Sequence, residues 1–467
     1  MIDLTPAELA EIVGGDLTIP HGVVAQAIVH GPVVVDSRLA VAGSVFFAMR
    51  GESQDGHEFA AAAVAAGAIL IVAERELPVG VPVIVVPDTL TALADVAREV
   101  VARVRATGRL RVVAVTGSNG KTTTKNMLRA VLERAGRTAA PRGSYNNQVG
   151  APLSMLDVDD DTRFLVVEMG ASAVGDIARL IAIVVPDVAI VLKVGLAHAG
   201  GFGSIEETAK AKAELVTQLP PDAVAVLNVD DTRVARMAAQ TRARVVTFGL
   251  SEAAQVRAED VRSSVDGTTF TLVAGAERVE VSLRILGEHN VMNALAAVAA
   301  TCELGVAPAD AAAALSTLQR AERWRMELLS APGGVTVIND AYNASPDSMA
   351  AALKTLAEVT RGSHRAIAVL GEMAELGDVA DEEHDRLGRL AVRLNIDRLI
   401  VVGHGARHIH NAAGLEGSWD GESVLVGGIE EAYDLLNGEV RSGDVVLVKS
   451  SNSAGLRMLG DRLAGVS

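Results

Sequence analysis

A short glycine-containing loop is the first stretch of this sequence whose residue types and spacing could do chemistry. Residues 112–122 read VVAVTGSNGKT, so an apolar run leads directly into the series G-x-x-G-K-T. The two glycines let backbone N–H groups turn toward phosphate oxygens. Lys121 supplies a point charge for the outer phosphates, and Thr122 supplies a hydroxyl for Mg²⁺. The nucleotide-binding residues predicted in the loop are Gly117, Ser118, Asn119, Gly120, Lys121, Thr122 and Thr123.

The spacing of this loop is shorter than usual. The common phosphate loop reads G-x-x-x-x-G-K-[ST], and that spacing would place its first glycine at Val115. The surrounding pattern still favours a nucleotide site, because a buried strand enters the loop and an amphipathic helix leaves it. The positive end of that helix favours anions.

Four other side chains could complete such a site. Glu168 ends the apolar run FLVVEMG, where ligands of a parallel sheet bind, so it could hold the Mg²⁺ of ATP. His198 follows the next apolar run. Asn290 and Asn293 are spaced i, i+3, so both amides can face one ligand. Taken alone, each has an ordinary alternative: a solvated glutamate, a structural histidine and amides on a helix surface.

The elements that must position these residues predict an α/β protein. A chain of 467 residues is too long for one hydrophobic core, so about three domains are expected. We expect domains at 1–108, 109–320 and 321–467. Apolar runs separated by helical patterns indicate parallel sheets covered on both faces. The predicted strands are 33–38, 68–73, 111–117, 163–170, 188–195, 223–230, 364–373, 397–403, 422–428 and 444–450. The other predicted elements are helices at 89–106 and 288–303 and a hairpin region at 245–286.

Composition excludes several classes of partner. The formal net charge is −16, which repels nucleic acid and anionic lipid. Cys302 is the single cysteine, so no internal disulfide framework can form. The longest apolar run, 59–73, is too short to span a bilayer. The acidic N-terminal stretch lacks the features of a signal peptide. We therefore expect a cytoplasmic protein without membrane insertion, acting as a monomer on small molecules.

A series of motifs then resembles a known family. GSNGKT, NNQVGAPLS, EMGAS, AHAGGFGS, AKAKAEL, LNVDD, GEHNVMNALAA and NDAYNASPDSM occur in this order. The series is similar to that of the Mur ligases of peptidoglycan precursor synthesis, whose own loop form is TG-[ST]-x-GK-[ST]. The resemblance extends to DSRLAVAGSVFFAMRGESQDGH at 36–57 and LGEMAELG at 370–377. It implies a small α/β UDP-binding domain, a central P-loop ATPase domain with a parallel sheet, and a C-terminal Rossmann-like domain.

The resemblance also implies a reaction. DAYNASPDSM, NNQVGAPLS and LGEMAELG look like the ligases that join D-alanyl-D-alanine to UDP-N-acetylmuramoyl-tripeptide with ATP. Alternatives are another amide ligase of this group, such as the one adding the third residue, and a P-loop nucleotide switch. The DNPR motif of the diaminopimelate-adding ligase is absent from the sequence. A switch would need neither His198 nor Lys212 nor a UDP-sugar domain.

Roles for individual residues follow from the resemblance. Thr122 and Glu168 would hold one Mg²⁺, and His198 a second, with Lys212 carbamylated by CO₂. Arg325 would reach the γ-phosphate across a hinge near 320–325. Lys193 stands where the family commonly has asparagine. Residues implied to contact ATP are Asn290, Asn293, Asp340, Tyr342 and Asn343. Residues implied to bind the UDP-linked substrate are Ser37, Arg38, Arg50, Asp55, Gly56, His57, Asn146 and Asn147.

Overall fold

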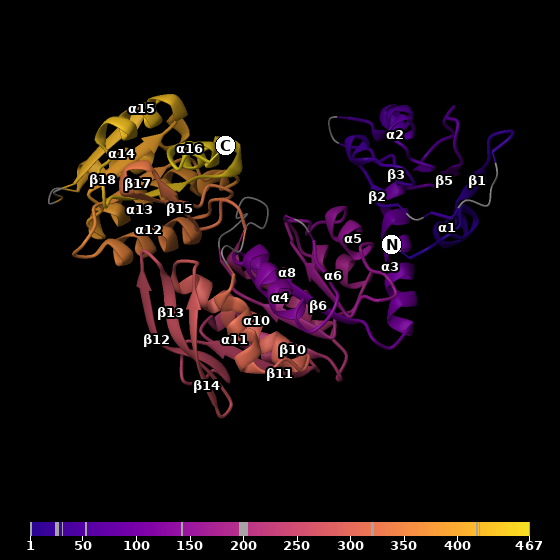
Figure 1. The fold of residues 1–467 in the computed structure, drawn as a ribbon, viewed down its shortest axis with the longest axis horizontal. Coiled ribbons are helices and arrows are strands. Elements are labelled where there is room, and N and C mark those ends of the chain that lie inside the picture. The colour runs from indigo at the N-terminus through magenta and orange to yellow at the C-terminus, as the bar shows by residue number, and fades with distance from the viewer. Residues whose placement is uncertain are drawn as a thin grey trace.

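The computed structural model describes residues 2–23, 28–29, 31–51, 54–141, 143–195, 204–318, 322–416, 419 and 421–466. Within these residues the strands form three separate sheets that follow one another along the chain. In Figure 1 the first and last units lie on opposite sides of the central unit. The predicted three-part α/β architecture is confirmed, while the domain boundaries at 108 and 320 stay predictions.

The first unit is a five-stranded sheet in the order β1-β5-β4-β3-β2, with β1 antiparallel to β5 and the other pairs parallel. Its strands are β1 (Asp16–Thr18), β2 (Val33–Val34), β3 (Val45–Phe47), β4 (Leu70–Ala73) and β5 (Val83–Val85). Its helices are α1 (Pro6–Val13), α2 (Ala60–Ala65) and α3 (Thr89–Ala106), the last with the predicted bounds. The predicted strand 33–38 ends early, because the Asp36 side chain caps a 3₁₀ turn that begins at Ser37.

The central unit is built on a nine-stranded sheet in the order β14-β13-β12-β11-β10-β9-β6-β8-β7. Its parallel strands are β6 (Arg111–Thr116), β7 (Thr138–Ala139), β8 (Phe164–Glu168), β9 (Val188–Val191), β10 (Val224–Asn228) and β11 (Arg244–Gly249). β12 (Val256–Ser264) pairs parallel with β11, and β13 (Gly267–Ala274) and β14 (Glu277–Leu283) add antiparallel hairpins. The predicted hairpin region therefore begins at β12, because β11 belongs to the parallel part.

Helices cover both faces of the parallel strands. They are α4 (Lys121–Leu132), α5 (Gly150–Met155), α6 (Asp176–Ile181), α8 (Ile205–Thr217), α9 (Thr232–Arg236), α10 (Glu288–Glu303) and α11 (Pro308–Ser316). Val113 and Val115 pack into the same core as Met127 of α4, whereas Val112 and Ala114 join the core beneath α3 and α5. Successive strand residues point to opposite faces, so a strand buried on both faces must be apolar throughout.

The order of the central strands defines where a ligand can bind. β7 and β8 lie on one side of β6, and the chain then crosses over to place β9, β10 and β11 on the other side. Ligands of open α/β sheets bind beyond the carboxyl ends of the strands at such a switch point. The loop that follows β6 is the predicted phosphate loop, so topology and motif agree on one location.

The third unit is a six-stranded sheet in the order β15-β16-β20-β17-β18-β19, in which only the pairing of β15 with β16 is antiparallel among the described strands. Its strands are β15 (Glu327–Ala331), β16 (Val335–Asn339), β17 (Ala366–Leu370), β18 (Arg398–Val402), β19 (Glu422–Val426) and β20 (Val445–Lys449). Its helices are α12 (Pro346–Thr360), α13 (Ala380–Arg393), α14 (Arg407–Leu415), α15 (Ile429–Glu439) and α16 (Arg457–Leu463). None of the described helices of the chain has the length and apolar character needed to cross a bilayer.

Candidate active site

The phosphate loop joins β6 to α4 at the carboxyl ends of the parallel strands. Gly120 has a φ of 86° and caps α4, a backbone conformation that favours glycine. A Cβ at this position would overlap the side-chain oxygen of Asn293, so α10 packs directly against the loop. The Ser118 hydroxyl is buried and donates to the Gly195 carbonyl at 3.1 Å, which ties the loop to the end of the β9 segment.

Glu168 lies beside the start of α4 as the last residue of β8. Its Oε1 accepts hydrogen bonds from the Asn146 amide at 2.7 Å and the Thr122 hydroxyl at 3.3 Å. Its Oε2 is buried and has no hydrogen-bond partner among the described residues. A buried anionic oxygen without a donor is costly, so this atom is suited to a cation. Thr122 and Glu168, predicted from separate motifs, are thus brought together.

Two lysines converge on the same region and both have lowered pKa values. The Lys121 ammonium donates to the Gly117 carbonyl at 2.7 Å, and burial lowers its pKa below 10.5 although the nearby Glu168 opposes the shift. Lys212 lies on α8 and is 2% exposed. Burial, reinforced by the positive charge of Lys121, lowers the Lys212 pKa to about 7. At neutral pH a large share of Lys212 therefore carries a free, nucleophilic amine.

Arg325 reaches the phosphate loop region from the third unit. Its neighbours Trp324 and Met326 have φ values of 59° and 50°, and the Met326 N–H donates to Asp340 at 3.0 Å. The guanidinium lies over the Tyr342 ring at 4.5 Å, and its Nη2 donates to the Ser144 hydroxyl at 3.2 Å. Its Nε is buried without a partner in the described part of the chain. An unpaired guanidinium N–H is suited to an anionic oxygen.

These contacts form one chain of hydrogen bonds between the two units. Arg325 donates to Ser144, whose Oγ lies 3.0 Å from the Thr122 hydroxyl, and Thr122 in turn donates to Glu168. Because the Thr122 proton is used toward Glu168, Ser144 must be the donor toward Thr122. Ser144 was not predicted from the sequence, since no periodic pattern or motif singles it out.

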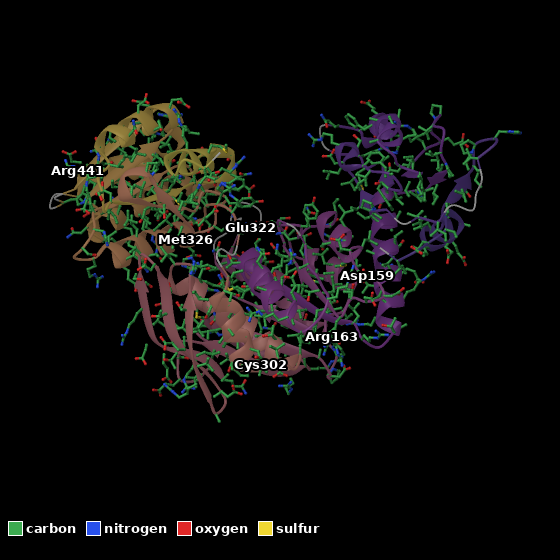
Figure 2. The ribbon with its side chains drawn as sticks, viewed as in Figure 1. Asp159, Arg163, Cys302, Glu322, Met326 and Arg441 are labelled. Carbon is green, nitrogen blue, oxygen red and sulfur yellow. The ribbon has the colours of Figure 1, made fainter. Side chains whose placement is uncertain are left out.

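Other contacts bring the third unit against the loop. Ser345 donates to the Asn119 side chain at 3.2 Å, and Asn126 of α4 donates to Glu322 at 3.1 Å. Figure 2 shows Glu322 and Met326 where the central and last units meet. Lys449 is buried and pairs with Asp340 at 2.6 Å, while also donating to the Asn343 carbonyl at 3.0 Å. The segment after β16 is therefore held close to the phosphate loop.

The two predicted asparagines of α10 bond to each other. The Asn293 amide donates to Asn290 at 3.0 Å, and Asn290 donates to the Leu286 carbonyl at 2.8 Å. Both are buried, so the interpretation as surface amides is wrong for this structure. His289 is adjacent, and burial lowers its pKa to about 4, which keeps the ring neutral.

The predicted substrate residues of the first unit make contacts within that unit. Arg38 is exposed and lowers the pKa of Asp36 to about 2, and Arg50 pairs with Glu74 at 2.9 Å. Asp55 accepts from the His57 backbone N–H and ring, and Gly56 leaves no room for a Cβ beneath Met49. Ser37 starts the 3₁₀ turn after β2. Their role toward a UDP-sugar stays a prediction.

His198 and Lys193, considered for the second metal site, and Asn146 and Asn147, expected to bind substrate, have different outcomes. His198 lies outside the described residues. The Lys193 side chain is exposed. Its backbone carbonyl accepts a hydrogen bond from the Ser118 N–H at 2.8 Å, so this residue contacts the phosphate loop through its main chain. The Asn147 side chain caps the start of α5 by accepting from Gly150 at 2.8 Å. Asn146, by contrast, holds Glu168.

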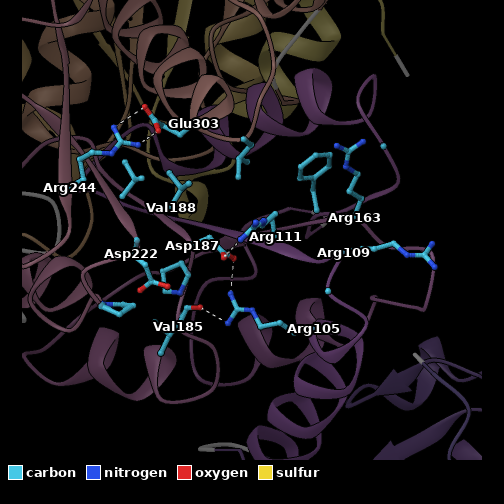
Figure 3. Close-up of a pocket in the computed structure, with 18 of the residues that line it drawn as sticks. Arg105, Arg109, Arg111, Arg163, Val185, Asp187, Val188, Asp222, Arg244 and Glu303 are labelled. Carbon is cyan, nitrogen blue, oxygen red and sulfur yellow. Dashed lines mark hydrogen bonds and ion pairs between the residues drawn. The ribbon is translucent and has the colours of Figure 1, made fainter.

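A large cavity of about 1310 Å³ lies at the opposite edge of the central sheet, where the parallel strands begin (Figure 3). Its arginines mostly meet local acceptors. Arg105 donates to the Val185 carbonyl at 2.9 Å and to Asp187 at 2.7 Å, Arg163 donates to the Ala135 carbonyl at 2.8 Å, and Arg244 pairs with Glu303. Cations near helix C-termini stabilise helices by offsetting the helix dipole, so we assign these arginines a structural role.

Comparisons with known proteins agree along the whole chain. Residues 31–101 match the Mur ligase family catalytic domain, 115–301 the Mur ligase middle domain, and 324–452 the Mur ligase glutamate ligase domain. A UDP-N-acetylmuramoyl-tripeptide–D-alanyl-D-alanine ligase of Mycobacterium tuberculosis is 44% identical, with 99% of this chain and 98% of the relative covered.

Solved structures show the same architecture. A structure of MurF from Acinetobacter baumannii is 30% identical, with a TM-score of 0.87 and 99% of each chain covered. A MurF ligase from Thermotoga maritima in complex with ADP is 29% identical, with a TM-score of 0.80 and coverage of 93% of this chain and 97% of that one. The protein described here therefore belongs to the Mur ligase family.

Proposed function

We propose that this protein joins D-alanyl-D-alanine to UDP-N-acetylmuramoyl-tripeptide at the expense of ATP. The products are UDP-N-acetylmuramoyl-pentapeptide, ADP and phosphate. The observation that carries the proposal is the hydrogen-bond chain from Arg325 through Ser144 and Thr122 to Glu168 beside the phosphate loop. The name of the 44% identical relative from Mycobacterium tuberculosis supplies the substrates.

The reaction needs an activated carboxylate. A carboxylate is a poor electrophile because its charge repels nucleophiles, so an oxygen of the tripeptide carboxylate first attacks the γ-phosphorus of ATP and ADP leaves. The amine of D-alanyl-D-alanine then attacks the carbonyl carbon of this acyl phosphate. Collapse of the tetrahedral intermediate releases phosphate and forms the amide. Charge gathers on the transferring group, so cations must surround it.

The residues of the loop and of the third unit supply those cations. The Lys121 ammonium lies within the loop and exchanges its bond to the Gly117 carbonyl for a phosphate oxygen. Arg325 offers its unpaired Nε to the γ-phosphate from the other side. Asn290 and Asn293 pack against the loop and help to hold the nucleotide, together with Asp340, Tyr342 and Asn343.

The residues also fit magnesium. Glu168 has a buried oxygen without a partner, and the Thr122 hydroxyl lies beside the same carboxylate. Carboxylates, hydroxyls and phosphate oxygens are the ligands that Mg²⁺ prefers. When bound, Mg²⁺ would supply positive charge that offsets the charge of the transferring phosphoryl group. We propose Thr122 and Glu168 for one ion and His198 with Lys212 for a second.

Lys212 is the residue proposed to be carbamylated. Its pKa of about 7 leaves free amine at neutral pH, and that amine can attack CO₂ to form a carbamate. The product carries a negative charge and oxygen atoms in place of a cation. This change explains why a buried lysine beside Lys121 would be retained, because the two side chains no longer repel each other.

The remaining assignments of the proposal concern the wider molecule. We assign Ser37, Arg38, Arg50 and the motif at 55–57 of the first unit to the UDP-linked substrate, since arginines suit bidentate phosphate binding. We place the reaction in the cytoplasm, where a chain with the single cysteine Cys302 meets a reducing environment. A monomeric state stays a prediction.

The test measures phosphate release and product mass together. The enzyme is incubated with Mg-ATP, UDP-N-acetylmuramoyl-tripeptide and D-alanyl-D-alanine, and each substrate is omitted in turn. We expect UDP-linked pentapeptide only with all three. Phosphate release without any carboxylate substrate would instead support a nucleotide switch, and ligation of a single amino acid to the UDP-linked dipeptide would support the third-residue ligase.

A further inference from the structure

A second lysine of α4 is buried more deeply than the phosphate-loop lysine. Lys125 lies one helical turn after Lys121 and has 0% of its surface exposed. Its ammonium donates to the backbone carbonyls of Pro141 and Gly143, both at 2.8 Å. Burial lowers its pKa below 10.5, while Glu168 opposes the shift. No salt bridge of Lys125 is found within the described residues, so two peptide dipoles carry its hydrogen bonding.

Keeping a cation in this position is costly. Desolvation of a charged group must be offset by good hydrogen bonds, and an apolar side chain of similar length would avoid the penalty. The neighbouring positions Met127, Leu128 and Val131 show that α4 accepts apolar residues in its core. We therefore infer that the Lys125 ammonium has a role that the apolar side chain of a methionine could not fill.

The two carbonyls lie directly before the residues that complete the candidate site. Gly143 is followed by Ser144, which links Arg325 to Thr122, and then by Asn146, which donates to Glu168. Gly143 has a φ of 66°, and a Cβ built on it would have nothing within 4 Å, so no neighbouring atoms pack against that side of the residue. The Lys125 ammonium and the Ser144–Thr122 hydrogen bond both attach this stretch of chain to α4, and only the lysine does so through the backbone carbonyls.

We propose that Lys125 is a positioning residue, which clamps the carbonyls of Pro141 and Gly143 so that Ser144 and Asn146 meet Thr122, Glu168 and Arg325. The expected effect on ligation rests on the proposed function. The effect on the backbone of residues 143–147 does not rest on it. Arg325 belongs to the third unit, so the clamp also keeps one of the links between the two units in register.

The first test is amide hydrogen exchange in Lys125→Met, which keeps the length of the side chain and removes its donors. We expect the Ala151 and Gly170 amides, which donate to the carbonyls of Asn147 and Asn146, to exchange at least about tenfold faster, because stable hydrogen bonds set protection. Exchange in β6 and β17 should not change. Arg129→Met is the matched control, since Arg129 lies on the same helix, is exposed and pairs with Glu133.

The second test is kinetic and separates positioning from general stability. The Mg²⁺ concentration needed for half-maximal rate should rise about tenfold in Lys125→Met, a loss typical of partners that orient metal ligands. The KM for D-alanyl-D-alanine should stay the same. The double variant with Ser144→Ala should be no slower than Lys125→Met alone, because non-additivity is expected when one residue acts through the other.

The outcomes are distinguishable. A variant that melts at a lower temperature but keeps wild-type loop exchange and wild-type Mg²⁺ dependence would show that Lys125 only stabilises the core. If Lys125→Met does not fold, Lys125→Leu, which also lacks a donor, takes its place, and unchanged loop exchange in that variant would equally overturn the proposal. If the wild-type enzyme lacks ligase activity, the proposed function fails, whereas hydrogen exchange still decides the positioning role.

Discussion

The Glu168 carboxylate has one oxygen that lowers the stability of the fold and is at the same time suited to bind a cation. Its Oε2 is buried without a donor in the described part of the chain, whereas its Oε1 is held by Thr122 and Asn146. A buried polar atom left without a partner costs about 1–3 kcal/mol. A cation beside this oxygen would remove that cost, so we expect Mg²⁺ to raise the melting temperature of the enzyme.

The substitution Glu168→Gln tests this conflict. The neutral amide can keep accepting through one oxygen and removes the buried charge, so we expect the free variant to melt at the same or a higher temperature than wild type. Its kcat/KM should fall at least about 100-fold, more than is typical for outer partners of a metal. Melting curves and initial rates measure the two effects.

Glu133→Gln is the control for that substitution. Glu133 is exposed and pairs with Arg129, and surface pairs contribute about 0–1 kcal/mol. Both its melting temperature and its rate should stay near wild type. If Glu168→Gln were as active as Glu133→Gln, the assignment of Glu168 to magnesium would be wrong.

Lys212 gives the site a pH dependence whose sign can be worked out. Its folded-state pKa is about 7, whereas its ordinary value is 10.5. Between these values the unfolded chain binds a proton that the folded chain does not, so the unmodified lysine makes stability rise as pH rises across this window. The penalty is fully present below pH 7, where the buried ammonium is charged in both states.

The same pKa predicts how carbamylation depends on pH. Enzyme depleted of CO₂ should regain activity when CO₂ is restored at fixed pressure, and the initial rate of recovery should be about tenfold higher at pH 8 than at pH 6, following the fraction of free amine. Lys212→Arg should show no recovery, because its guanidinium stays protonated. Equal recovery at both pH values would contradict the assignment.

At the scale of elements, the phosphate loop depends on two conditions at Gly120. The backbone has a φ of 86°, and α10 packs so closely that a Cβ would overlap Asn293. Gly108 has a similar φ of 80° but has nothing within 4 Å of a built Cβ. Comparing Gly120 with Gly108 therefore separates the cost of the left-handed backbone from the cost of the overlap with Asn293.

Gly120→Ala should therefore be more harmful than Gly108→Ala. For Gly108→Ala we expect a loss of about 1–2 kcal/mol from the left-handed backbone alone and unchanged ATP affinity. Gly120→Ala must also displace α10 or the loop, so ATP should bind at least about tenfold more weakly as N–H donors are lost. Denaturant unfolding and calorimetric titration of ATP measure both, and equal effects would contradict the packing argument.

Much of the element pattern was predictable and some of it was not. The helices 89–106 and 288–303 were predicted with their observed bounds, the first because it is amphipathic and capped by Asp88, and the second because it is alanine-rich. β15 and β16 were not among the predicted strands, although Pro332, Gly333 and Gly334 between them are residues typical of a turn. β11 was assigned to the hairpin region because pairing partners are not visible in a local pattern.

The candidate site shows the same division. Thr122 and Glu168 could be brought together from the sequence, because parallel strands place their carboxyl ends at one edge. Ser144 and Lys125 could not, since Ser144 lies in a segment without periodicity and Lys125 resembles a surface lysine on an amphipathic helix. Because other elements pack against α4 on more than one side, Thr123, Thr124 and Lys125 are all buried.

At the scale of the molecule, the central and last units already touch around the nucleotide loop. Arg325 contacts Ser144, Ser345 contacts Asn119, and Glu322 contacts Asn126. The first unit lies on the other side of the central unit in Figure 1. A substrate held by the first unit and ATP held between the other two must therefore be enclosed by relative movement of the units.

Scattering in solution measures that movement. We expect the radius of gyration to decrease when a non-hydrolysable ATP analogue with Mg²⁺ and UDP-N-acetylmuramoyl-tripeptide are added together, as the units close. Residues 320 and 321 of the predicted hinge lie outside the described residues. Arg325→Ala should reduce the change, because it removes a link between the last unit and the nucleotide. Profiles that stay unchanged with both ligands would contradict closure.

The most direct test of the account follows oxygen atoms through the reaction. UDP-N-acetylmuramoyl-tripeptide labelled with ¹⁸O in its terminal carboxylate is incubated with Mg-ATP and D-alanyl-D-alanine, and all products are analysed by mass. Activation as an acyl phosphate predicts one ¹⁸O in the released phosphate and one in the new amide of the pentapeptide. Unlabelled phosphate without pentapeptide would mean that ATP hydrolysis is not coupled to ligation, and would contradict the proposed function.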